Sequence, residues 1–223
     1  MNLPDYKSDT YHRLRHPEFF ESEDLFLAWS YFVRHIYFKN VNLVDRRILE
    51  YGGALGYNLL QLKEYADVAL LEPSGLGRTI AEKHGIPSYA SAIELSNTVF
   101  DIVLCRHVLE HIVHPAIALE EIHSLLVKDG QLILILPIDK INGIIIDNSD
   151  INHHLYMWNA QAISNLLGVA GFSVNCIRYE YYGMRKKLLP LFRLLGGSCY
   201  ARAVRAAGRL FNFRELLIVA NKL

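Results

Sequence analysis

The segment RRILEYGGALGYNLL, residues 46–60, decides the fold of this chain. It begins with the apolar residues of a buried strand and continues with three closely spaced glycines, Gly52, Gly53 and Gly56. Glycine loses more conformational freedom on folding than any other residue, so such a cluster marks a tight turn or a close approach of backbone to ligand. A strand, a glycine-rich turn and a helix form the phosphate- or nucleoside-binding corner of doubly wound α/β proteins. The segment therefore predicts this fold, with a ligand at the turn.

Length and composition are those of one globular domain without net charge. The chain has 223 residues, with 23 Lys and Arg against 23 Asp and Glu, and this balance gives no indication of nucleic-acid binding. Its three cysteines lack CxxC spacing, as expected in a reducing cytoplasm. The N-terminal segment has no signal-peptide core, and no apolar run reaches the roughly 18 residues of a membrane span. We therefore expect a cytoplasmic protein.

Segments of strand and helix character alternate along the rest of the chain. The expected strands are 47–50, 68–72, 86–90, 100–105, 131–137, 173–182 and 214–222. The expected helices are 57–65, 76–85, 115–130 and 159–172, preceded by one or two packing helices within 18–39. This alternation implies a parallel, doubly wound sheet, in which the unbroken apolar run 131–137 is central.

The residues around the glycine turn narrow the choice of ligand. A nicotinamide-binding fold shows G-x-G-x-x-G after its first strand. Here the register is Glu50-x-Gly52-x-Ala54-x-Gly56, which disfavours an NAD-dependent oxidoreductase. Glu72 ends the second expected strand, and its two carboxylate oxygens match the vicinal hydroxyls of a ribose. The pattern predicts a nucleoside-containing ligand.

Five segments carry a resemblance to a known family. They are ILEYGGALG (48–56), LLEPSG (70–75), FDIVLCRHVLEHIVHP (100–115), LLVKDGQLILILP (125–137) and AGFSV (170–174). In order and spacing they resemble class I S-adenosylmethionine-dependent methyltransferases, most closely the small-molecule branch of types 11 and 23. The likeness covers residues 46–180 and the final strand, and it is weak over 1–45 and 183–214.

The resemblance implies a Rossmann-like, seven-stranded, doubly wound sheet whose last strand runs antiparallel. We expect an N-terminal helical cap in residues 1–45 and a methyltransferase core in 46–223 with a basic helical insert at 183–214. The implied cofactor is S-adenosyl-L-methionine, with Glu72 on its ribose. The full set of expected cofactor-binding residues is Glu50, Gly52, Gly53, Ala54, Gly56, Glu72, Pro73, Ser91, Cys105 and Arg106. Two of these depart from many relatives, which have glycine at Ala54 and aspartate near Ser91.

The segment HVLEH, residues 107–111, also matches the H-x-x-E-H signature of inverted zinc proteases. On a helix, His107 and His111 would share one face and could bind one metal ion. The segment follows a buried strand directly, however, and no obvious third ligand stands on a downstream helix. We therefore expect no metal.

Histidines after the fourth strand are the expected catalytic groups, because ligands bind at this edge of open α/β sheets. Methyl transfer is an in-line displacement, and a hydroxyl or ammonium acceptor must also lose a proton, for which histidine is suited near neutral pH. His111 is the first choice, followed by His107 and His154. We expect O-methylation of a small glycosyl, cell-envelope or quinone-like acceptor. The alternative is a non-catalytic methyltransferase-like module that binds the cofactor.

Residues 183–214 contain eight basic residues and no acidic one. Arg202, Arg205 and Arg209 have the spacing of one helical face. A basic amphipathic helix can lie on anionic lipid, or it can form a lid over an anionic acceptor, and the sequence favours neither. The first alternative predicts weak peripheral contact with the inner face of a membrane.

Overall fold

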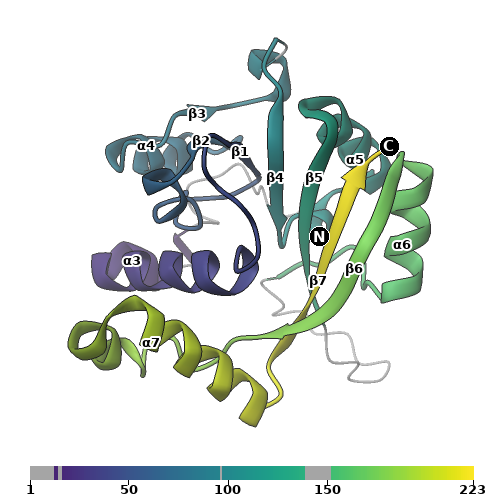
Figure 1. Cartoon of the computed structure of the whole chain (residues 1–223). Helices are drawn as coiled ribbons and strands as arrows, with labels where there is room; N and C mark the ends of the chain where they lie inside the picture. The colour runs from purple at the N-terminus through teal and green to yellow at the C-terminus, as the bar shows by residue number, and fades with distance from the viewer. Residues whose placement is uncertain (1–12, 15–16, 96, 139–151) are drawn as a thin grey trace.

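A computed structural model describes residues 13–14, 17–95, 97–138 and 152–223. Its centre is a seven-stranded sheet with the strand order β3-β2-β1-β4-β5-β7-β6 (Figure 1). The strands are β1 (Arg47–Tyr51), β2 (Asp67–Leu71), β3 (Ser88–Tyr89), β4 (Phe100–Arg106), β5 (Leu126–Pro137), β6 (Phe172–Tyr181) and β7 (Arg214–Lys222). Neighbouring strands are parallel except at β7, which runs antiparallel to both β5 and β6. The expected Rossmann-like sheet with an antiparallel last strand is confirmed.

Helices cover both faces of the sheet. They are α2 (Pro17–Glu21), α3 (Glu23–Phe32), α4 (Gly75–Lys83), α5 (Pro115–Leu125), α6 (Ala160–Val169) and α7 (Leu189–Leu210). Short helical turns of other types are η1 (Val33–Tyr37), η2 (Leu62–Glu64), η3 (Ala92–Leu95) and η4 (Leu109–His111). α5 and α6 pack on one face, whereas α3 and α7 lie side by side on the other (Figure 1). Within the described part of the chain, no helix has the length and apolar character needed to cross a membrane.

The apolar run 131–137 was expected to be the central strand, but the middle of the sheet is β4 and β5 lies next to it. As an interior strand, β5 still shows why a buried strand is apolar at successive positions. Ile133 and Ile135 are buried in the core under α3 and α7, whereas Leu132, Leu134 and Leu136 are buried under α5 and α6. Successive side chains of a strand point to opposite faces, so a strand between two helical layers needs an apolar residue at each position.

The N-terminal helices are joined to α7 by close packing. A Cβ built on Gly197 of α7 would lie 2.1 Å from the ring of Tyr31 in α3, so only glycine allows this approach. One residue earlier, Gly196 interrupts α7 with a φ of 78°, a left-handed conformation that glycine adopts readily. Residues 1–12 and 15–16 of the expected cap lie outside the described residues.

The expected helix 57–65 is wrong, because this segment forms turns and the short 3₁₀ helix η2. Tyr57, Asn58, Leu59 and Leu62 are all buried, although an amphipathic surface helix exposes one face. The side chain of Asn58 is also hydrogen-bonded on both sides, to β1 and to α3. These tertiary contacts override the local preference for helix.

The helix expected over 115–130 ends earlier, at Leu125. Leu126 is already extended, with φ −91° and ψ 143°, and it pairs with Phe100 of β4. β5 therefore begins within the segment that we expected to be helical.

The basic segment 183–214 is partly neutralised by acidic side chains from elsewhere in the chain. Arg205 donates two hydrogen bonds of 2.9 Å to the buried carboxylate of Glu180 in β6. The expectation that Arg205 forms an open cationic face with Arg202 and Arg209 is therefore wrong. Two further ion pairs of the segment are Arg185–Glu18 at 3.0 Å and Arg193–Asp24 at 2.6 Å. Lys186, Lys187, Arg202 and Arg209 are exposed and form no ion pair among the described residues, and the same holds for Arg214, which lies over the ring of Tyr179.

Candidate active site

The carboxyl ends of β1, β2, β4 and β5 meet at one edge of the sheet, and the antiparallel β7 begins at this edge. A cavity of about 500 Å³ lies there, within the range of roughly 300–1,000 Å³ that is usual for ligand sites. The predicted cofactor residues that line it are Gly52, Gly53, Ala54, Glu72, Pro73, Ser91 and Arg106. The predicted catalytic residues His107, His111 and His154 line the same cavity. Glu50, Gly56 and Cys105 are buried outside this lining.

The glycines of the turn are required by side chains that pack against them. A Cβ built on Gly52, whose φ is 71°, would lie 2.8 Å from the side chain of Val108. A Cβ on Gly53 would lie 2.3 Å from the carboxyl carbon of Glu50. Neither distance is compatible with a side chain, so bare backbone lines the cavity at both positions. Ala54 has a φ of 51°, which strains a residue with a Cβ by roughly 1 kcal/mol.

Glu50 is the next-to-last residue of β1 and is buried beneath the turn. Its Oε1 accepts a short hydrogen bond from the side-chain amide of Asn58, whose Oδ1 accepts one of 2.8 Å from the Trp29 indole. Oε2 of Glu50 is buried and has no hydrogen-bond partner among the described residues. Burial raises the pKa of Glu50 to about 8, although the Asn58 amide and the Arg106 guanidinium both lower it. The hydrogen bonds from Trp29 to Asn58 and from Asn58 to Glu50 thus connect α3 to the glycine turn.

Glu72 follows β2 and holds the next part of the cavity wall together. Its carboxylate accepts hydrogen bonds of 2.9 Å from the backbone N–H groups of Ala54 and Ser74. Glu72 also lines the cavity, where a carboxylate can accept hydrogen bonds from hydroxyl donors. A carboxylate suited to a ribose, a bare glycine turn and a cavity of this volume fit S-adenosylmethionine.

A buried ion pair closes the cavity on the β7 side. Arg106, at the end of β4, donates a hydrogen bond of 3.2 Å to Glu215 near the start of β7. Tyr37 donates a short hydrogen bond to the other oxygen of Glu215, and it accepts one of 3.3 Å from Arg106. Burial alone would raise the pKa of Glu215, but Arg106, His107 and Tyr37 together lower it. Glu215 is therefore an ionised acceptor.

His107 completes this network and faces the cavity. Its Nε2 lies 3.0 Å from the ionised Glu215 and therefore donates, which leaves Nδ1 as the basic atom of the ring. Burial and the neighbouring Arg106 lower the pKa of His107 to about 4, so the ring is neutral near pH 7. His107 has a φ of 53°, in the left-handed region, so the chain turns sharply where β4 ends.

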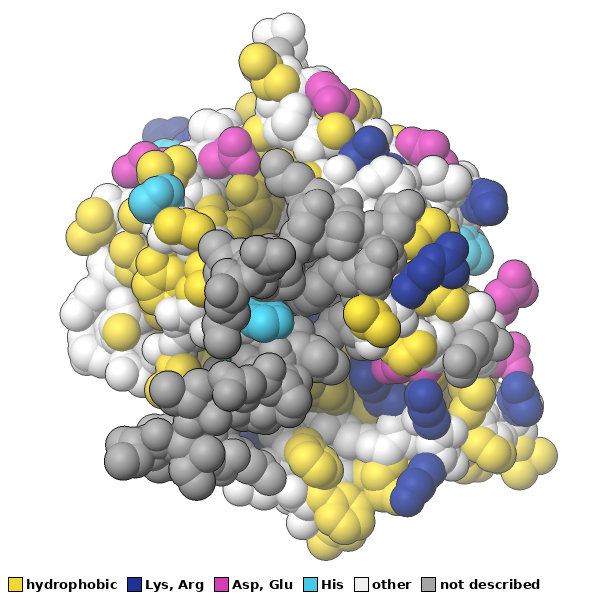
Figure 2. Space-filling view, turned by 180° about the vertical axis from the view of Figure 1, so that it is seen from behind, with side chains coloured by type: hydrophobic (Ala, Val, Ile, Leu, Met, Phe, Trp, Pro, Cys, Tyr) yellow, Lys and Arg dark blue, Asp and Glu magenta, His cyan; other side chains and the backbone are white. Residues whose placement is uncertain are grey.

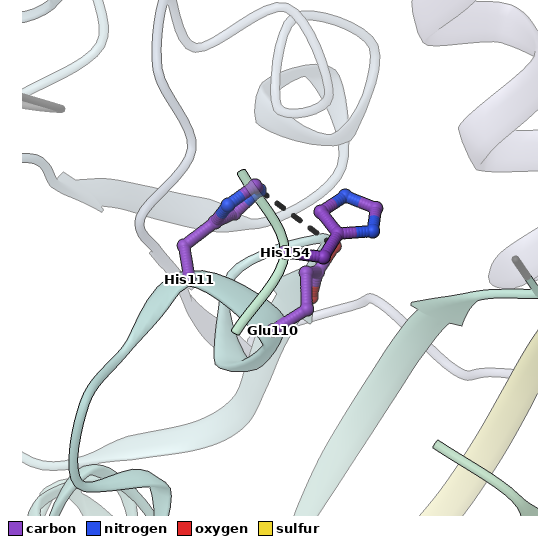
Figure 3. Close-up of side chains that lie close together, drawn as sticks. All are labelled: Glu110, His111 and His154. Atoms are coloured by element: carbon purple, nitrogen blue, oxygen red, sulfur yellow. Dashed lines mark ion pairs between the residues drawn. The ribbon is translucent and has the colours of Figure 1, made fainter. Parts of the chain in front are cut away.

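The other two predicted histidines meet at a carboxylate (Figure 3). Glu110 and His111 belong to the turn η4, and His154 comes from the segment that precedes α6. His111 Nε2 lies 3.9 Å from Glu110 Oε1, and the His111 and His154 ring centroids are 5.0 Å apart. One nitrogen or oxygen of each residue lies within 4.8 Å of the others. HVLEH is thus a turn in which His107 and His111 have different partners, not a helix with two histidines on one face.

A second cavity of about 470 Å³ adjoins the first, and the two share Pro137 and Tyr182. Its wall includes the cationic side chains of Arg185 and Arg214 and the aromatic ring of Phe213. An amphipathic acceptor with an anionic group matches this lining.

Comparisons with known proteins agree with this geometry. A model of the methyltransferase domain family matches residues 23–177. The magnesium protoporphyrin IX methyltransferase of Synechocystis, solved with bound S-adenosylhomocysteine, is 16% identical with a TM-score of 0.63, over 98% of this chain and 97% of that one. The 1,6-didemethyltoxoflavin-N1-methyltransferase of Burkholderia thailandensis is 17% identical with a TM-score of 0.57, over 100% of this chain and 93% of that one.

A cyclase, SpnF, is also similar, with 17% identity and a TM-score of 0.58 over 87% of this chain and 79% of that one. At such identities the solved structures show the fold alone. A comparison with curated proteins finds no match. The family match, by contrast, spans more than half of the chain. The chain therefore belongs to the class I S-adenosylmethionine-dependent methyltransferases, and its cofactor is S-adenosylmethionine.

Sequence reasoning did not find Asn58, Tyr37 or Glu215. A signal for Glu215 was present, because an antiparallel last strand must begin at the edge where the parallel strands end. Asn58 lay within a segment that was expected to be a surface helix. Tyr37 was one of many aromatic residues in the N-terminal region, and nothing in its spacing set it apart.

Proposed function

We propose that this methyltransferase methylates an oxygen atom of a small molecule, with glycosyl, cell-envelope and quinone-like compounds as the leading acceptor classes. The observation that carries this proposal is a single cavity lined both by the cofactor turn and by three histidines. Histidine can accept a hydroxyl proton near neutral pH, so the cavity combines a methyl donor with the means of activating an oxygen acceptor.

The proposed roles follow from the contacts of each residue. Glu72 would hold the ribose of the cofactor, and Gly52, Gly53 and Ala54 would present backbone to its methionine part. Glu50 would support this turn from below, since its carboxyl group packs against Gly53. The bound cofactor supplies a methyl group on a positively charged sulfur. The hydroxyl proton of the acceptor would pass to a histidine of the cavity.

His111, His107 and His154 are the candidate proton acceptors. The backbone carbonyl of Glu110 accepts a hydrogen bond of 2.7 Å from the N–H of Leu155, which fastens the segment that carries His154 above the turn η4. All three imidazoles line the cavity, His107 and His111 from the segment after β4 and His154 from the segment before α6. Positioning of this kind contributes to catalysis because it removes the entropy cost of alignment.

The experiment that tests the function is a screen of hydroxylated acceptors with S-adenosylmethionine labelled in its methyl group. Labelled product together with S-adenosylhomocysteine supports the proposal. Cofactor binding without S-adenosylhomocysteine release for any acceptor would favour the alternative, a non-catalytic cofactor-binding module. This outcome is worth testing because the cyclase SpnF has the same fold.

We further propose weak contact with an anionic membrane surface through α7 and the residues that follow it. Leu194, Leu210 and Phe211 are exposed there by 79%, 79% and 51%. Hydrophobic and basic side chains lie together along the lower edge of the molecule in Figure 2. Apolar side chains beside exposed cations suit the headgroup region of an anionic leaflet.

A further inference from the structure

Glu110, His111 and His154 form a cluster in the cavity, and the proposed proton transfer gives Glu110 no role. Figure 3 shows the three side chains converging from two separate segments. One ligand atom of each lies within 4.8 Å of the others, and Glu110 is completely buried. A carboxylate and two imidazoles are the ligands of many three-residue sites for zinc and other first-row divalent ions.

The backbone holds these three groups in place. Glu110 and His111 share the turn η4. The segment that carries His154 is bonded to this turn through the 2.7 Å hydrogen bond from Leu155 to Glu110. A second bond joins the two segments, because the Tyr156 hydroxyl donates to the carbonyl of Val113 at 2.8 Å. The fold therefore holds the two segments that carry the cluster against each other.

The distances are close to those of an occupied site. Bonds of about 2.0–2.2 Å to zinc place tetrahedral ligand atoms roughly 3.4 Å apart. His111 Nε2 and Glu110 Oε1 are separated by 3.9 Å. A shift of about half an ångström, within the reach of side-chain rotation, would bring this pair to coordination distance.

We propose that Glu110, His111 and His154 bind a first-row divalent cation whose open coordination positions face the cofactor cavity. His107 is not among the ligands through Nε2, because Glu215 holds that nitrogen. The cation site revises the expectation of no metal, and it uses a different set of residues from the H-x-x-E-H pairing.

This site also narrows the acceptor class, an inference that rests on the proposed function. A divalent cation polarises a bound hydroxyl group and makes its proton easier to remove. Three protein ligands leave one or more positions open, so a hydroxyl next to a second oxygen can bind through both atoms. Vicinal sugar diols and catechol-type rings have this arrangement. We infer that the acceptor carries such a neighbouring oxygen pair.

The binding test uses the full-length protein, freed of metal by chelator and titrated with Zn²⁺ in a calorimeter. We expect one equivalent to bind, with at least a tenfold weaker dissociation constant for His154→Ala and for Glu110→Gln. The matched control is His114→Ala, which removes an exposed histidine three positions from His111 and leaves the dissociation constant unchanged. S-adenosylhomocysteine binding, measured on each variant, shows that its fold is retained.

The possible results of these experiments separate the cation site from the proposed function. Equal Zn²⁺ affinity in the wild type and in His154→Ala, or no saturable binding in the wild type, would overturn the cation site. His154 lies in an irregular segment, so this variant remains informative even if Glu110→Gln fails to fold. Methyl transfer that is unaffected by chelator and by His154→Ala would remove the cation site and leave the proposed function intact. Saturable Zn²⁺ binding without methylation of any hydroxylated acceptor would support the cation site and overturn the proposed function.

Discussion

At the scale of single residues, the glycine turn has a strained backbone. Side chains also pack against it so closely that neither Gly52 nor Gly53 could carry a Cβ. Gly52, Ala54 and Gly56 all have positive φ values, of 71°, 51° and 77°. Ala54 alone has a Cβ in this conformation, and its N–H donates to Glu72. Strained residues that are held by surrounding contacts are common at ligand sites, where the strain keeps the backbone in its binding conformation. The turn is thus preorganised before the cofactor arrives.

Glu72→Ala is expected to weaken binding of S-adenosylhomocysteine roughly ten- to hundredfold. Loss of hydrogen bonds to a charged group costs about 1.5–3 kcal/mol, and each 1.4 kcal/mol is a tenfold change in the dissociation constant. Calorimetric titration measures the effect. Glu82→Ala, which removes an exposed carboxylate from α4, is the matched control and should bind like the wild type. Unchanged affinity in Glu72→Ala would contradict the assignment of Glu72 to the ribose.

Glu50 is expected to make stability depend on pH. Its ordinary pKa is 4.5, and burial raises the pKa in the folded protein to about 8. The folded state therefore holds an additional proton between these values, so this contribution to stability is fully present below pH 4.5 and is lost as the pH rises through about 8. The loss is on the order of a few kcal/mol.

Chemical denaturation of the wild type and of Glu50→Gln across this pH range measures the contribution of Glu50. The difference between the two isolates the contribution of Glu50 from those of His107 and His123, whose lowered pKa values act in the opposite direction. Parallel curves for the two proteins would show that Glu50 is ionised in the fold.

The residue scale also shows what the sequence could predict. The place of Glu72 in the cavity wall was predictable, because Glu72 directly follows a parallel strand. The carboxyl ends of parallel strands meet at the edge of the sheet where ligands bind. Asn58 was not predictable, since its importance comes from Trp29 and Glu50, which are distant in the chain and meet it only in the folded structure. The cluster of Glu110, His111 and His154 was missed for the same reason: His154 comes from a separate segment that no periodicity places over the turn.

At the scale of elements, the reversed direction of β7 determines the composition of the site. Pro137 at the end of β5 pairs with Glu215 near the start of β7, so the last strand brings a carboxylate to the ligand edge. A parallel last strand would end there instead and would place Glu215 at the opposite edge. The antiparallel strand was predicted through the family resemblance, whereas the ion pair with Arg106 required the fold.

Glu215→Gln is expected to lower the free energy of unfolding by about 3–5 kcal/mol, because it leaves the buried Arg106 without its counter-charge. The control is Asp101→Asn, which removes the partner of Arg46 in a more exposed pair at 2.9 Å. Loss of an exposed pair costs about 1 kcal/mol or less. Urea denaturation compares the two variants. Equal destabilisation would show that the buried pair has no special weight in the fold.

The elements themselves were predictable to different degrees. The strands were found because alternating or unbroken apolar runs bury at least one face. The segments at 57–65 and 126–130 were assigned to helix in error, since tertiary contacts decide both. In the first segment buried side chains replace an amphipathic face, and in the second Leu126 pairs with β4.

At the scale of the whole molecule, the surface of the basic segment 183–214 is less charged than its sequence indicates, because three of its arginines are paired internally. We expect the wild type to bind vesicles that contain anionic lipid, and to lose this binding as salt is raised. Each cation near such a surface contributes about 1 kcal/mol, and the attraction fades within about 10 Å at 0.1 M salt. Sedimentation with vesicles measures it.

Replacing the exposed cations should abolish vesicle binding and leave the core folded. The variant combines Lys186→Gln, Lys187→Gln, Arg202→Gln and Arg209→Gln. A control variant with Lys39→Gln, Lys83→Gln and Lys128→Gln removes exposed lysines outside the segment and should bind like the wild type. If the wild type ignores anionic vesicles at low salt, α7 has no membrane role, and the same four changes should instead raise KM for an anionic acceptor.

The hydrogen bonds that link Trp29 through Asn58 to Glu50 have a consequence for the fluorescence of the protein. The protein contains two tryptophans, and each is attached to a different half of the site. Trp29 is linked to the cofactor turn, and Trp158 stacks on Tyr156 in the segment that carries His154. Indole emission responds to local polarity and hydrogen bonding, so intrinsic fluorescence can report occupancy without a label. Substituting one tryptophan at a time would separate the cofactor signal from the acceptor signal.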